Sequence, residues 1–331
     1  MISFLTDLFG IAQGWLFQVV VQPIVLYLGF GAYTEEAFEG TEWLLIGVAE
    51  LALLFAVLRP LEAWFPVQSI SDARARWNDF LYTVLHRLGL FPILIFFTLD
   101  PLMDRLAGVL RLDNIQPMNL DSLWPNLGPV GSFLLYLLVL DFFDYWYHRA
   151  SHTFNWWWGL HSLHHSQQDM NLWSDNRNHL LDDAMRDVYM ALIALGIGVA
   201  PAQYVLLVSV SRILQSLQHA NIRLHFGALG ERLLVSPRYH RMHHAIDVSA
   251  DLALHGKRFV TGCNFAVLFP VWDILFRSAN FRPEFVATGL HDQLPQKNDA
   301  GAIVPGRCYG RGFWRQQWLG LARMVGDKAR A

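Results

Sequence analysis

Long apolar stretches without charged side chains recur along this chain of 331 residues. A helix needs about 20 apolar residues to cross the hydrocarbon core of a bilayer. Only Glu50 interrupts the second of these stretches, and only His86 and Arg87 interrupt the third. The pattern predicts membrane-embedded helices in five places: residues 8–34, 43–58, 80–99, 122–140 and 188–211.

The first and last of these stretches have distinguishing details. The first lacks a basic leading region and a small-residue cleavage site, so we interpret it as a retained helix rather than a signal peptide. The last contains Gly196, Gly198 and Pro201 near its middle. Because glycine and proline interrupt helices, a hairpin of two half-length helices fits this stretch better than one straight span, which stays open as the alternative.

The charges of the loops predict an orientation, because Lys and Arg are enriched on the cytoplasmic side of membrane proteins. Residues 32–42 carry four glutamates and no base, and residues 100–121 carry four aspartates against two arginines. Residues 59–79 contain three arginines, and the tail after Phe276 has nine bases and four acids. We therefore expect an all-α, polytopic integral membrane protein with a cytoplasmic amino terminus, about four transmembrane helices and a membrane hairpin.

The composition agrees with a membrane protein and excludes several other classes. Hydrophobic residues make up 53% of the chain and charged residues 16%, with a net charge of -3. Soluble domains carry about 25% charged residues, so a disordered chain or a basic nucleic-acid-binding protein is excluded. The two cysteines, Cys263 and Cys308, are too few for a disulfide framework or a thiolate metal cluster.

Histidines gather in the second half of the chain at spacings of three and four residues, which place side chains on one face of a helix. Neutral imidazole is a good ligand for Zn, Fe, Cu and Ni. Eight to ten such ligands exceed the needs of one ion, so the pattern predicts two metals. The candidate ligands are His148, His152, His161, His164, His165, His240, His243 and His244, completed by His179 and His219. His225, six residues after His219, is a weaker candidate.

These clusters resemble the histidine boxes of the fatty acid hydroxylase/sterol desaturase superfamily of membrane di-iron enzymes. The family pattern is HxxxH or HxxxxH followed by two HxxHH boxes, and the three clusters match it in order. Arg177-Asn-His179-Leu-Leu-Asp182 is similar to the family's R-x-H-P-L-E, with Leu for Pro and Asp for Glu. Asn264-Phe-Ala and Trp272-Asp273-Ile-Leu-Phe276 are similar to its tail. The resemblance covers about residues 125–280.

The resemblance implies hydroxylation or desaturation of a C–H bond of a lipid substrate, using two Fe ions, O2 and two external electrons. It implies no catalytic residues beyond the metal ligands. The chain has no dinucleotide fingerprint, iron–sulfur ligand set or haem domain, so electrons must come from another protein or a diffusible reductant. The spacing from His219 to the last box and the Asn-Leu-Trp stretch after His165 are similar to the alkylglycerol monooxygenase branch, which uses tetrahydrobiopterin.

Carboxylates near the boxes are candidates to orient the ligands, because metal-bound histidines give their second N–H to an acceptor. Asp144 lies one turn before His148, and Asp182 lies beside His179. Their alternative role is a helix-end charge or a salt bridge with Arg149 or Arg177. Asp273 is a third candidate, with an ion pair to Arg277 as its alternative. Glu50 and Arg87, inside predicted spans, are candidates to pair with each other.

Two other functions would use the same histidines. A zinc-dependent membrane hydrolase would need a general base beside an open site, and the sequence lacks H-E-x-x-H. A metal-binding transporter or sensor would place its ligands within the spans. We expect a membrane anchor over residues 1–140, a histidine-bearing catalytic region over 141–280 and an irregular, peripheral cytoplasmic tail over 281–331, all in one structural domain. The membrane would be the bacterial inner membrane, or the endoplasmic reticulum in a eukaryote.

Overall fold

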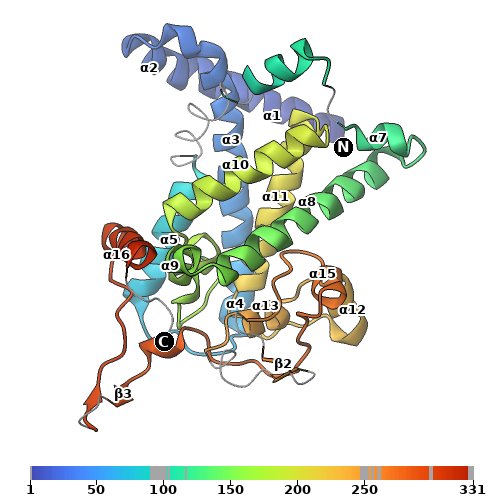
Figure 1. The fold of residues 1–331 in the computed structure, drawn as a ribbon. Helices are drawn as coiled ribbons and strands as arrows, with labels where there is room; N and C mark the ends of the chain where they lie inside the picture. Colours follow the sequence, from blue (N-terminus) through green and yellow to red (C-terminus); the bar gives the residue numbers. More distant parts are fainter. Residues whose placement is uncertain are drawn as a thin grey trace.

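Helices form most of the regular structure of the chain (Figure 1). A computed structural model describes residues 2–89, 102, 105–115, 118–246, 253–254, 257–258, 262–297 and 301–326. The α-helices include α1 (Ile2–Leu16), α2 (Gln22–Tyr27), α3 (Thr34–Leu53), α4 (Arg59–Trp64), α5 (Ala73–Arg87), α7 (Leu120–Leu123), α8 (Gly128–Thr153), α9 (Asn155–His165), α10 (Leu180–Gly196), α11 (Pro201–His219), α12 (Gly227–Leu233), α13 (Pro237–His243), α15 (Val271–Leu275) and α16 (Phe313–Val325).

Shorter elements complete the described fold. Two π-helical turns, η1 (Phe17–Val21) and η3 (Leu54–Leu58), join α1 to α2 and α3 to α4. The 3-10 turns are η2 (Gly31–Tyr33), η4 (Ser174–Asn176) and η5 (His291–Gln293). Two antiparallel hairpins pair β1 (Ala253–Leu254) with β2 (Lys257–Arg258) and β3 (Gln296–Lys297) with β4 (Ile303–Val304). The expectation of a helical protein is therefore confirmed.

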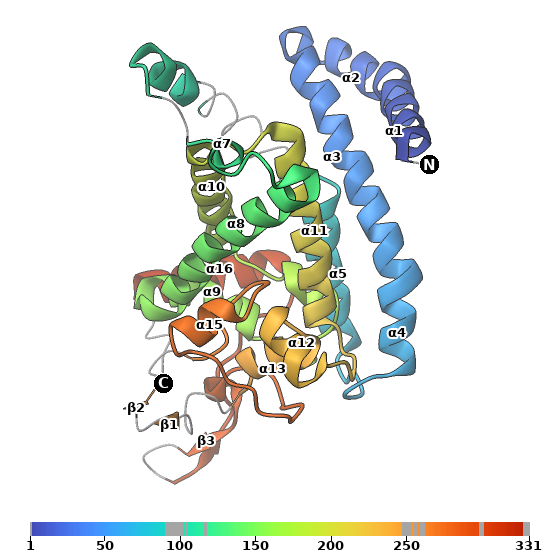
Figure 2. The ribbon, with the colours of Figure 1, turned by 90° about the vertical axis from the view of Figure 1, so that its right-hand side faces the viewer.

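Three helices among the described residues are long and apolar enough to cross a membrane: Thr6–Tyr27, Gly31–Trp64 and Gly128–Thr153. They overlap the first and fourth predicted stretches and contain the second. The second helix has 34 residues, so it is about 51 Å long and exceeds a hydrocarbon core of ~30 Å. Figure 2 shows α3 continuing into α4 along one side of the molecule. The third predicted stretch begins inside α5 and overlaps it up to Arg87. Residues 90–99 of this stretch lie outside the described residues.

The last apolar stretch is broken, as its glycines and proline predicted. Helix α10 ends at Gly196 and α11 begins at Pro201, which occupies the first helical turn where its missing N–H has no role. Gly198 in the turn has φ of +73°, a conformation that glycine adopts without strain. Figure 2 shows both helices descending from this turn. The stretch is thus two helices and not one straight span.

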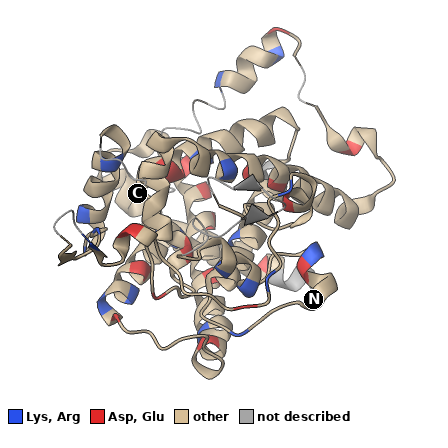
Figure 3. Cartoon of the chain, turned by 60° about the horizontal axis from the view of Figure 1, so that its bottom comes forward, with Lys and Arg blue, Asp and Glu red and all other residues tan. Residues whose placement is uncertain are grey.

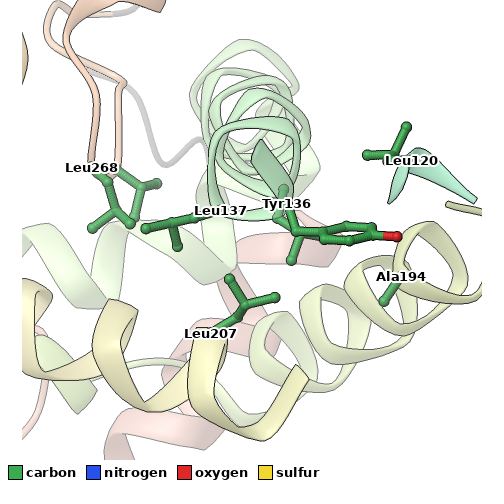
Figure 4. Close-up of a cluster of buried hydrophobic side chains, with 8 residues drawn as sticks. Leu120, Tyr136, Leu137, Ala194, Leu207 and Leu268 are labelled. Carbon is green, nitrogen blue, oxygen red and sulfur yellow. The ribbon is translucent and has the colours of Figure 1, made fainter. Parts of the chain in front are cut away.

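An apolar cluster holds the third long helix against this pair of helices (Figure 4). Leu120 of α7, Tyr136, Leu137 and Leu140 of α8, Ala194 of α10, Leu207 of α11, and Val267 and Leu268 are all buried there. Burying a side chain of this size contributes about 1.5–3 kcal/mol. Figure 3 shows the charged residues as scattered segments of a mostly uncharged ribbon, and the packing of apolar surfaces in this cluster helps to position α8 and α11.

The amino-terminal helices are tied to the histidine-bearing part by buried polar groups. Glu62, at the end of the long α3–α4 helix, accepts N–H groups from Leu172 and Asn221, both at 2.8 Å. Arg87 of α5 pairs with Glu50 of α3 at 2.5 Å, which confirms the pairing that the sequence suggested. Charges buried in this way are paired because an isolated charge is costly to bury.

The carboxyl-terminal tail contains a packed helix, so the expectation of wholly irregular structure there is wrong. Helix α16 lies against α9 and α5 (Figure 1). A Cβ atom on Gly159 of α9 would lie 2.6 Å from the backbone N of Met324. Glycine therefore lets the two helices approach at backbone distance. The sequence concealed this helix because several of its large apolar residues, Trp314, Trp318 and Val325, face away from the protein core.

Candidate metal centre

The ends of four helices bring the histidines together below the long apolar helices. His148 and His152 lie in the last turns of α8, and the second box ends α9. His219 is the last residue of α11. Ser236 begins α13, since its side chain accepts the N–H of Tyr239 and Pro237 fills the first turn. The third box therefore begins within one turn of the capped amino terminus of α13.

Nine of the predicted ligands form two groups whose ring nitrogens lie within 4.8 Å of one another in each group. The five-histidine group contains His148, His152, His161, His165 and His243. The four-histidine group contains His164, His219, His240 and His244. The two groups adjoin, since the rings of His165 and His244 stack with centroids 4.2 Å apart.

Helical phase explains how each HxxHH box serves both groups. Residues four apart on a helix point the same way, and neighbouring residues diverge by about 100°. His161 and His165 thus enter the five-histidine group, and His164 between them enters the other. The last box does the reverse, because His240 and His244 share the four-histidine group. The sequence analysis placed each box on one face, but the structure divides each box between two groups.

The four-histidine group brings nitrogens into direct contact. The Nε2 atom of His219 lies 3.1 Å from that of His164 and 3.0 Å from that of His240. The Nε2 atom of His244 lies 3.1 Å from that of His240. The Nδ1–H of His219 donates to the carbonyl of Gln215 at 2.8 Å, so its Nε2 carries a lone pair. A lone pair this close to two other ring nitrogens can accept an N–H from one of them or bind a metal ion.

Two backbone carbonyls hold ligands of the five-histidine group. His148 donates from Nδ1 to the carbonyl of Phe265 at 2.8 Å, and His243 donates from Nδ1 to that of Cys263 at 2.7 Å. Asn264, between them, has φ of +57°, a left-handed conformation that asparagine tolerates. Its side chain amide donates to the carbonyls of Tyr239 and Asn280, both at 3.0 Å. This turn therefore aims two carbonyls at two ligands.

Asp182 holds a third ligand of the same group. Its carboxylate accepts from His161 Nδ1 at 3.0 Å, from Trp157 Nε1 at 2.7 Å and from the hydroxyl of Tyr147 at 2.9 Å. Burial raises the pKa of Asp182, but these three donors outweigh it and hold the pKa below its ordinary value. Asp182 is thus an anion whose histidine partner is the candidate ligand His161, and not His179 as its position in the sequence suggested.

The other two predicted carboxylates act differently from expectation. Both oxygens of Asp144 bond to the guanidinium of Arg186 on α10, one of them at 2.8 Å, so Asp144 does not orient His148. The prediction was wrong because the Nδ1 of His148 already has Phe265 as its acceptor. Asp273 accepts from the N–H groups of Phe265 and Ala266, at 2.8 and 2.9 Å. It therefore supports His148 through the backbone, and not by contact.

His179 and His225 lie outside both groups. His179 caps α10, where its Nδ1 accepts the N–H of Leu181 at 3.1 Å. Its Nε2 donates to the carbonyl of Gln317 in α16 at 2.9 Å. Both ring nitrogens of His179 therefore have partners within the chain, and the structure does not bring this residue to a metal group. His225 is exposed, and its Nδ1 accepts the N–H of Gly227.

The residues fit a pair of metal ions. The Nε2 atoms of His161, His165 and His243 are buried and have no hydrogen-bond partner among the residues that the structure describes. Burial lowers the pKa of His243 to about 3. Burial and neighbouring imidazoles hold the pKa values of His164, His165, His240 and His244 well below their ordinary value. Buried neutral imidazoles with unused lone pairs are the form that binds metals.

A buried polar chain behind the four-histidine group was not predicted. Asp175 lies 3.7 Å from Nδ1 of His219 and accepts from the hydroxyl of Ser216 at 2.9 Å. Arg87 donates to the same hydroxyl at 2.8 Å and pairs with Glu50. The chain of contacts therefore runs from a candidate ligand to the long α3 helix. The sequence marked two members of this chain, Glu50 and Arg87, because they are ionisable residues inside apolar stretches. Nothing in the sequence marked Asp175.

Comparison with known proteins points to one family. Residues 133–278 match the family model described as fatty acid hydroxylase. The chain is 29% identical to human alkylglycerol monooxygenase over 153 residues, which are 46% of this chain and 32% of that enzyme. It is 25% identical to an ornithine lipid hydroxylase from Rhizobium tropici over 169 residues, 50% of this chain and 47% of that protein. The Caenorhabditis elegans alkylglycerol monooxygenase matches at 28% over 148 residues, 44% of this chain and 26% of that enzyme. No solved structure matches.

The matches therefore span less than half the length of each of these relatives. The matched region of this chain contains both histidine groups, the turn around Asn264 and the carboxylates Asp182 and Asp273. Residues 133–278 of this protein therefore match the fatty acid hydroxylase family, and the alkylglycerol monooxygenases are among the proteins to which they are similar.

Proposed function

We propose that this protein is a membrane-bound, non-haem di-iron monooxygenase that hydroxylates a C–H bond of a lipid. The observation that carries the proposal is the division of nine buried or half-buried histidines into two adjoining groups of five and four. One metal ion cannot use nine imidazoles, and zinc needs only four ligands in a closed site. Paired sites of nitrogen ligands suit redox-active iron better than a hydrolytic zinc ion.

In this proposal each group holds one iron ion. His148, His152, His161, His165 and His243 hold the first, and His164, His219, His240 and His244 the second. When bound, the irons supply the electron transfer that activates O2. The protein keeps the Nδ1 protons of His148, His161 and His243 on fixed acceptors, so that their Nε2 lone pairs face the ions. Burial excludes bulk water from both groups.

The substrate class follows from the relatives and from the fold. Two different relatives are named for oxygenation of lipids, an alkylglycerol and an ornithine lipid. The three apolar helices support a location in a membrane, where a lipid would reach the enzyme without leaving the bilayer. Hydroxylation is proposed over desaturation because both named relatives hydroxylate. The loop charges support a site on the cytoplasmic side, in residues 141–280, anchored by residues 1–140.

The two electrons are proposed to come from outside the chain. The described residues show no thiolate cluster, since Cys263 is buried and Cys308 is exposed and both are free. A redox protein or tetrahydrobiopterin is therefore the proposed donor, and the similarity to the alkylglycerol monooxygenases supports the pterin. A purified sample that oxygenates lipid with a ferredoxin or cytochrome b5 chain, but not with tetrahydrobiopterin, would contradict the pterin as the electron donor.

Metal analysis of the purified full-length protein tests the proposal. We expect about two iron ions per chain in protein from iron-supplied cells. His164→Ala and His243→Ala each alter a different group, so each should lower the iron content and abolish oxygenation of extracted lipids. His225→Ala is the matched control, because this imidazole is exposed and lies outside both groups.

The product is followed by mass spectrometry of lipids from cells that express the wild-type protein or either ligand variant. A lipid that gains one oxygen atom only with the wild-type protein supports the hydroxylase. A single zinc ion per chain after purification from iron-supplied cells would contradict the di-iron centre. Unchanged lipid oxygenation by His243→Ala would contradict the ligand assignment. Zinc content must be measured together with iron, since nitrogen sites prefer zinc to iron(II).

A further inference from the structure

Helix α16 presents large apolar residues to the outside, and its buried face is mostly polar apart from Phe313. The side chains of Trp314 and Trp318 are 78% and 71% exposed, and Val325 is exposed on the same side. Positions four and seven residues apart lie on one helix face, so these three form a continuous apolar stripe. Gln316, Gln317 and Arg323 are buried on the opposite face. This is the reverse of a helix on the surface of a soluble domain.

The polar inner face is fixed by hydrogen bonds, so the helix cannot roll to bury its tryptophans. Gln316 accepts from Asn78 of α5 at 2.7 Å. Gln317 accepts the N–H of Leu180 at 2.8 Å and donates to the hydroxyl of Tyr82 at 3.0 Å. A side chain on Gly320 would meet the ring of His179, with its Cβ 2.3 Å from Cδ2. The exposure of the apolar stripe is therefore built into the packing.

We propose that the outer face of α16 lies in the interface of the bilayer that contains the long apolar helices. Tryptophan is enriched at membrane–water interfaces, where its ring contacts acyl chains and its N–H meets headgroups. Arg311 and Arg315 are exposed at the start of the helix, where anionic headgroups attract basic side chains. Helix α16 is thus an anchor that lies in the plane of the membrane and contacts lipid mainly through its tryptophans. The sequence predicted only a peripheral cytoplasmic tail for this segment.

The surface of α5 connects this stripe to a helix that is long enough to span the membrane. Trp77 and Leu81 of α5 are exposed, and their neighbours Asn78 and Tyr82 contact α16. The ring of Phe80 meets Trp77 at 5.2 Å. It also meets the exposed Phe55, inside the 34-residue helix, at 5.7 Å. Exposed aromatic groups therefore extend from a candidate span across α5 to α16, as a shared lipid contact requires.

Spin labelling of the full-length protein in vesicles of phosphatidylcholine and phosphatidylglycerol tests this placement. A nitroxide is attached to Trp318→Cys, or separately to Trp314→Cys, in a Cys308→Ser background where Cys263 is buried and does not react. Collisions with O2, which concentrates in lipid, are compared with collisions with a water-soluble nickel chelate. The control is Ile303→Cys in the β3–β4 hairpin, because Ile303 is an equally exposed apolar side chain away from the stripe.

We expect the ratio of O2 to nickel collisions to be several-fold higher at positions 314 and 318 than at position 303. Equal ratios at all three positions would overturn the proposal. Low accessibility to both reagents, with spin–spin broadening that disappears on dilution with unlabelled protein, would also overturn it, because it would show a second copy on this face. Both cysteine variants must melt at the wild-type temperature, which their exposed positions favour.

Discussion

The acceptors of the Nδ1 protons differ in kind among the candidate ligands. His148 and His243 donate to backbone carbonyls, whereas His161 donates to the carboxylate of Asp182. A carboxylate draws the Nδ1 proton more strongly than a carbonyl does and makes the Nε2 atom a better electron donor. A neutral carbonyl fixes the direction of the ring without adding charge. We therefore expect His161 to be the ligand that is most sensitive to its partner.

Asp182→Asn tests the contribution of this charge. We expect the iron affinity of the five-histidine group to fall about 10- to 100-fold, because an amide is a weaker acceptor for His161 and cannot supply negative charge. Titration of the metal-free protein with iron(II) gives the affinity directly, without an activity assay.

Asp183→Asn is the matched control for this variant. Asp183 is the next residue on α10 and pairs with His86 at 2.8 Å, outside both histidine groups. Its change removes a carboxylate–histidine pair of the same kind but leaves His161 untouched. Equal losses of iron affinity in the two variants would contradict the role of Asp182.

The candidate ligands were largely predictable from the sequence, and their partners were not. Periodicity identifies His161 and His165 as neighbours on one helix face without any knowledge of the fold. Their division between two centres also follows from helical phase once two metals are assumed. By contrast, the carbonyls of Cys263 and Phe265 carry no sequence signal, because every residue has a carbonyl. Asp144 looked like a partner of His148 by spacing alone, but Arg186 takes both of its oxygens.

At the scale of elements, close helix packing at two contacts positions the site. Helix α9 touches α16 at Gly159, and helices α3 and α5 are joined by Glu50 and Arg87. The contact at Gly159 leaves no room for a side chain. The contact between Glu50 and Arg87 neutralises two buried charges among apolar residues. Each contact therefore predicts a different response to substitution.

Gly159→Ala tests the first contact. The new Cβ would lie 2.6 Å from the N atom of Met324 and 2.8 Å from the carbonyl carbon of Arg323, so backbone must move. We expect a destabilisation of about 1–3 kcal/mol, seen as a lower melting temperature in detergent. Gly196→Ala is the control, since nothing lies within 4 Å of its added Cβ. A melting temperature of Gly159→Ala equal to that of the control would contradict the close approach.

Glu50→Gln tests the second contact. Arg87 would lose its closest carboxylate, and a buried guanidinium would keep only its contacts to Ser216, the carbonyl of Arg212 and the more distant Asp175. Removing one partner of a buried ion pair costs about 3 kcal/mol or more, so the protein should melt at a lower temperature. Glu35→Gln on the same helix is the control, because Glu35 is exposed. A double variant, Glu50→Gln with Arg87→Met, that restores stability would support the pair as the cause.

At the scale of the whole molecule, the helical fold and its two clearest spans follow from apolar stretches alone. The break at Gly198 and the helix start at Pro201 were also predictable, because these residues restrict backbone conformation locally. Helix α16 was not predictable, since its pattern depends on which side faces the protein. The attachment of Glu62 to Leu172 and Asn221 joins residues far apart in sequence, and no local pattern encodes such a contact.

The buried histidines make the metal-free protein sensitive to acid. Burial lowers the pKa of His243 from 6.5 to about 3, so between these values the unfolded chain binds a proton that the folded chain does not. The free energy of unfolding therefore falls as the pH drops below about 6.5. His164, His165, His240 and His244 shift in the same direction.

We expect the melting temperature of metal-free protein in detergent to fall steadily from about pH 7 to about pH 5. His225→Ala should show the same dependence on pH, because this exposed imidazole lies outside both histidine groups. A melting temperature that is constant over this range would contradict burial of neutral imidazoles.

The unequal spread of the two histidine groups along the chain has a consequence for biosynthesis. His148, His152, His161 and His165 leave the ribosome within one short segment, and only His243 of that group follows much later. In the other group only His164 is early, and His219, His240 and His244 are all late. A nascent chain therefore carries four of the five ligands of one centre before the other centre has more than one. We therefore expect metal that binds during synthesis to reach the five-histidine group first, although neighbouring residues, His243 and His244, complete the two groups.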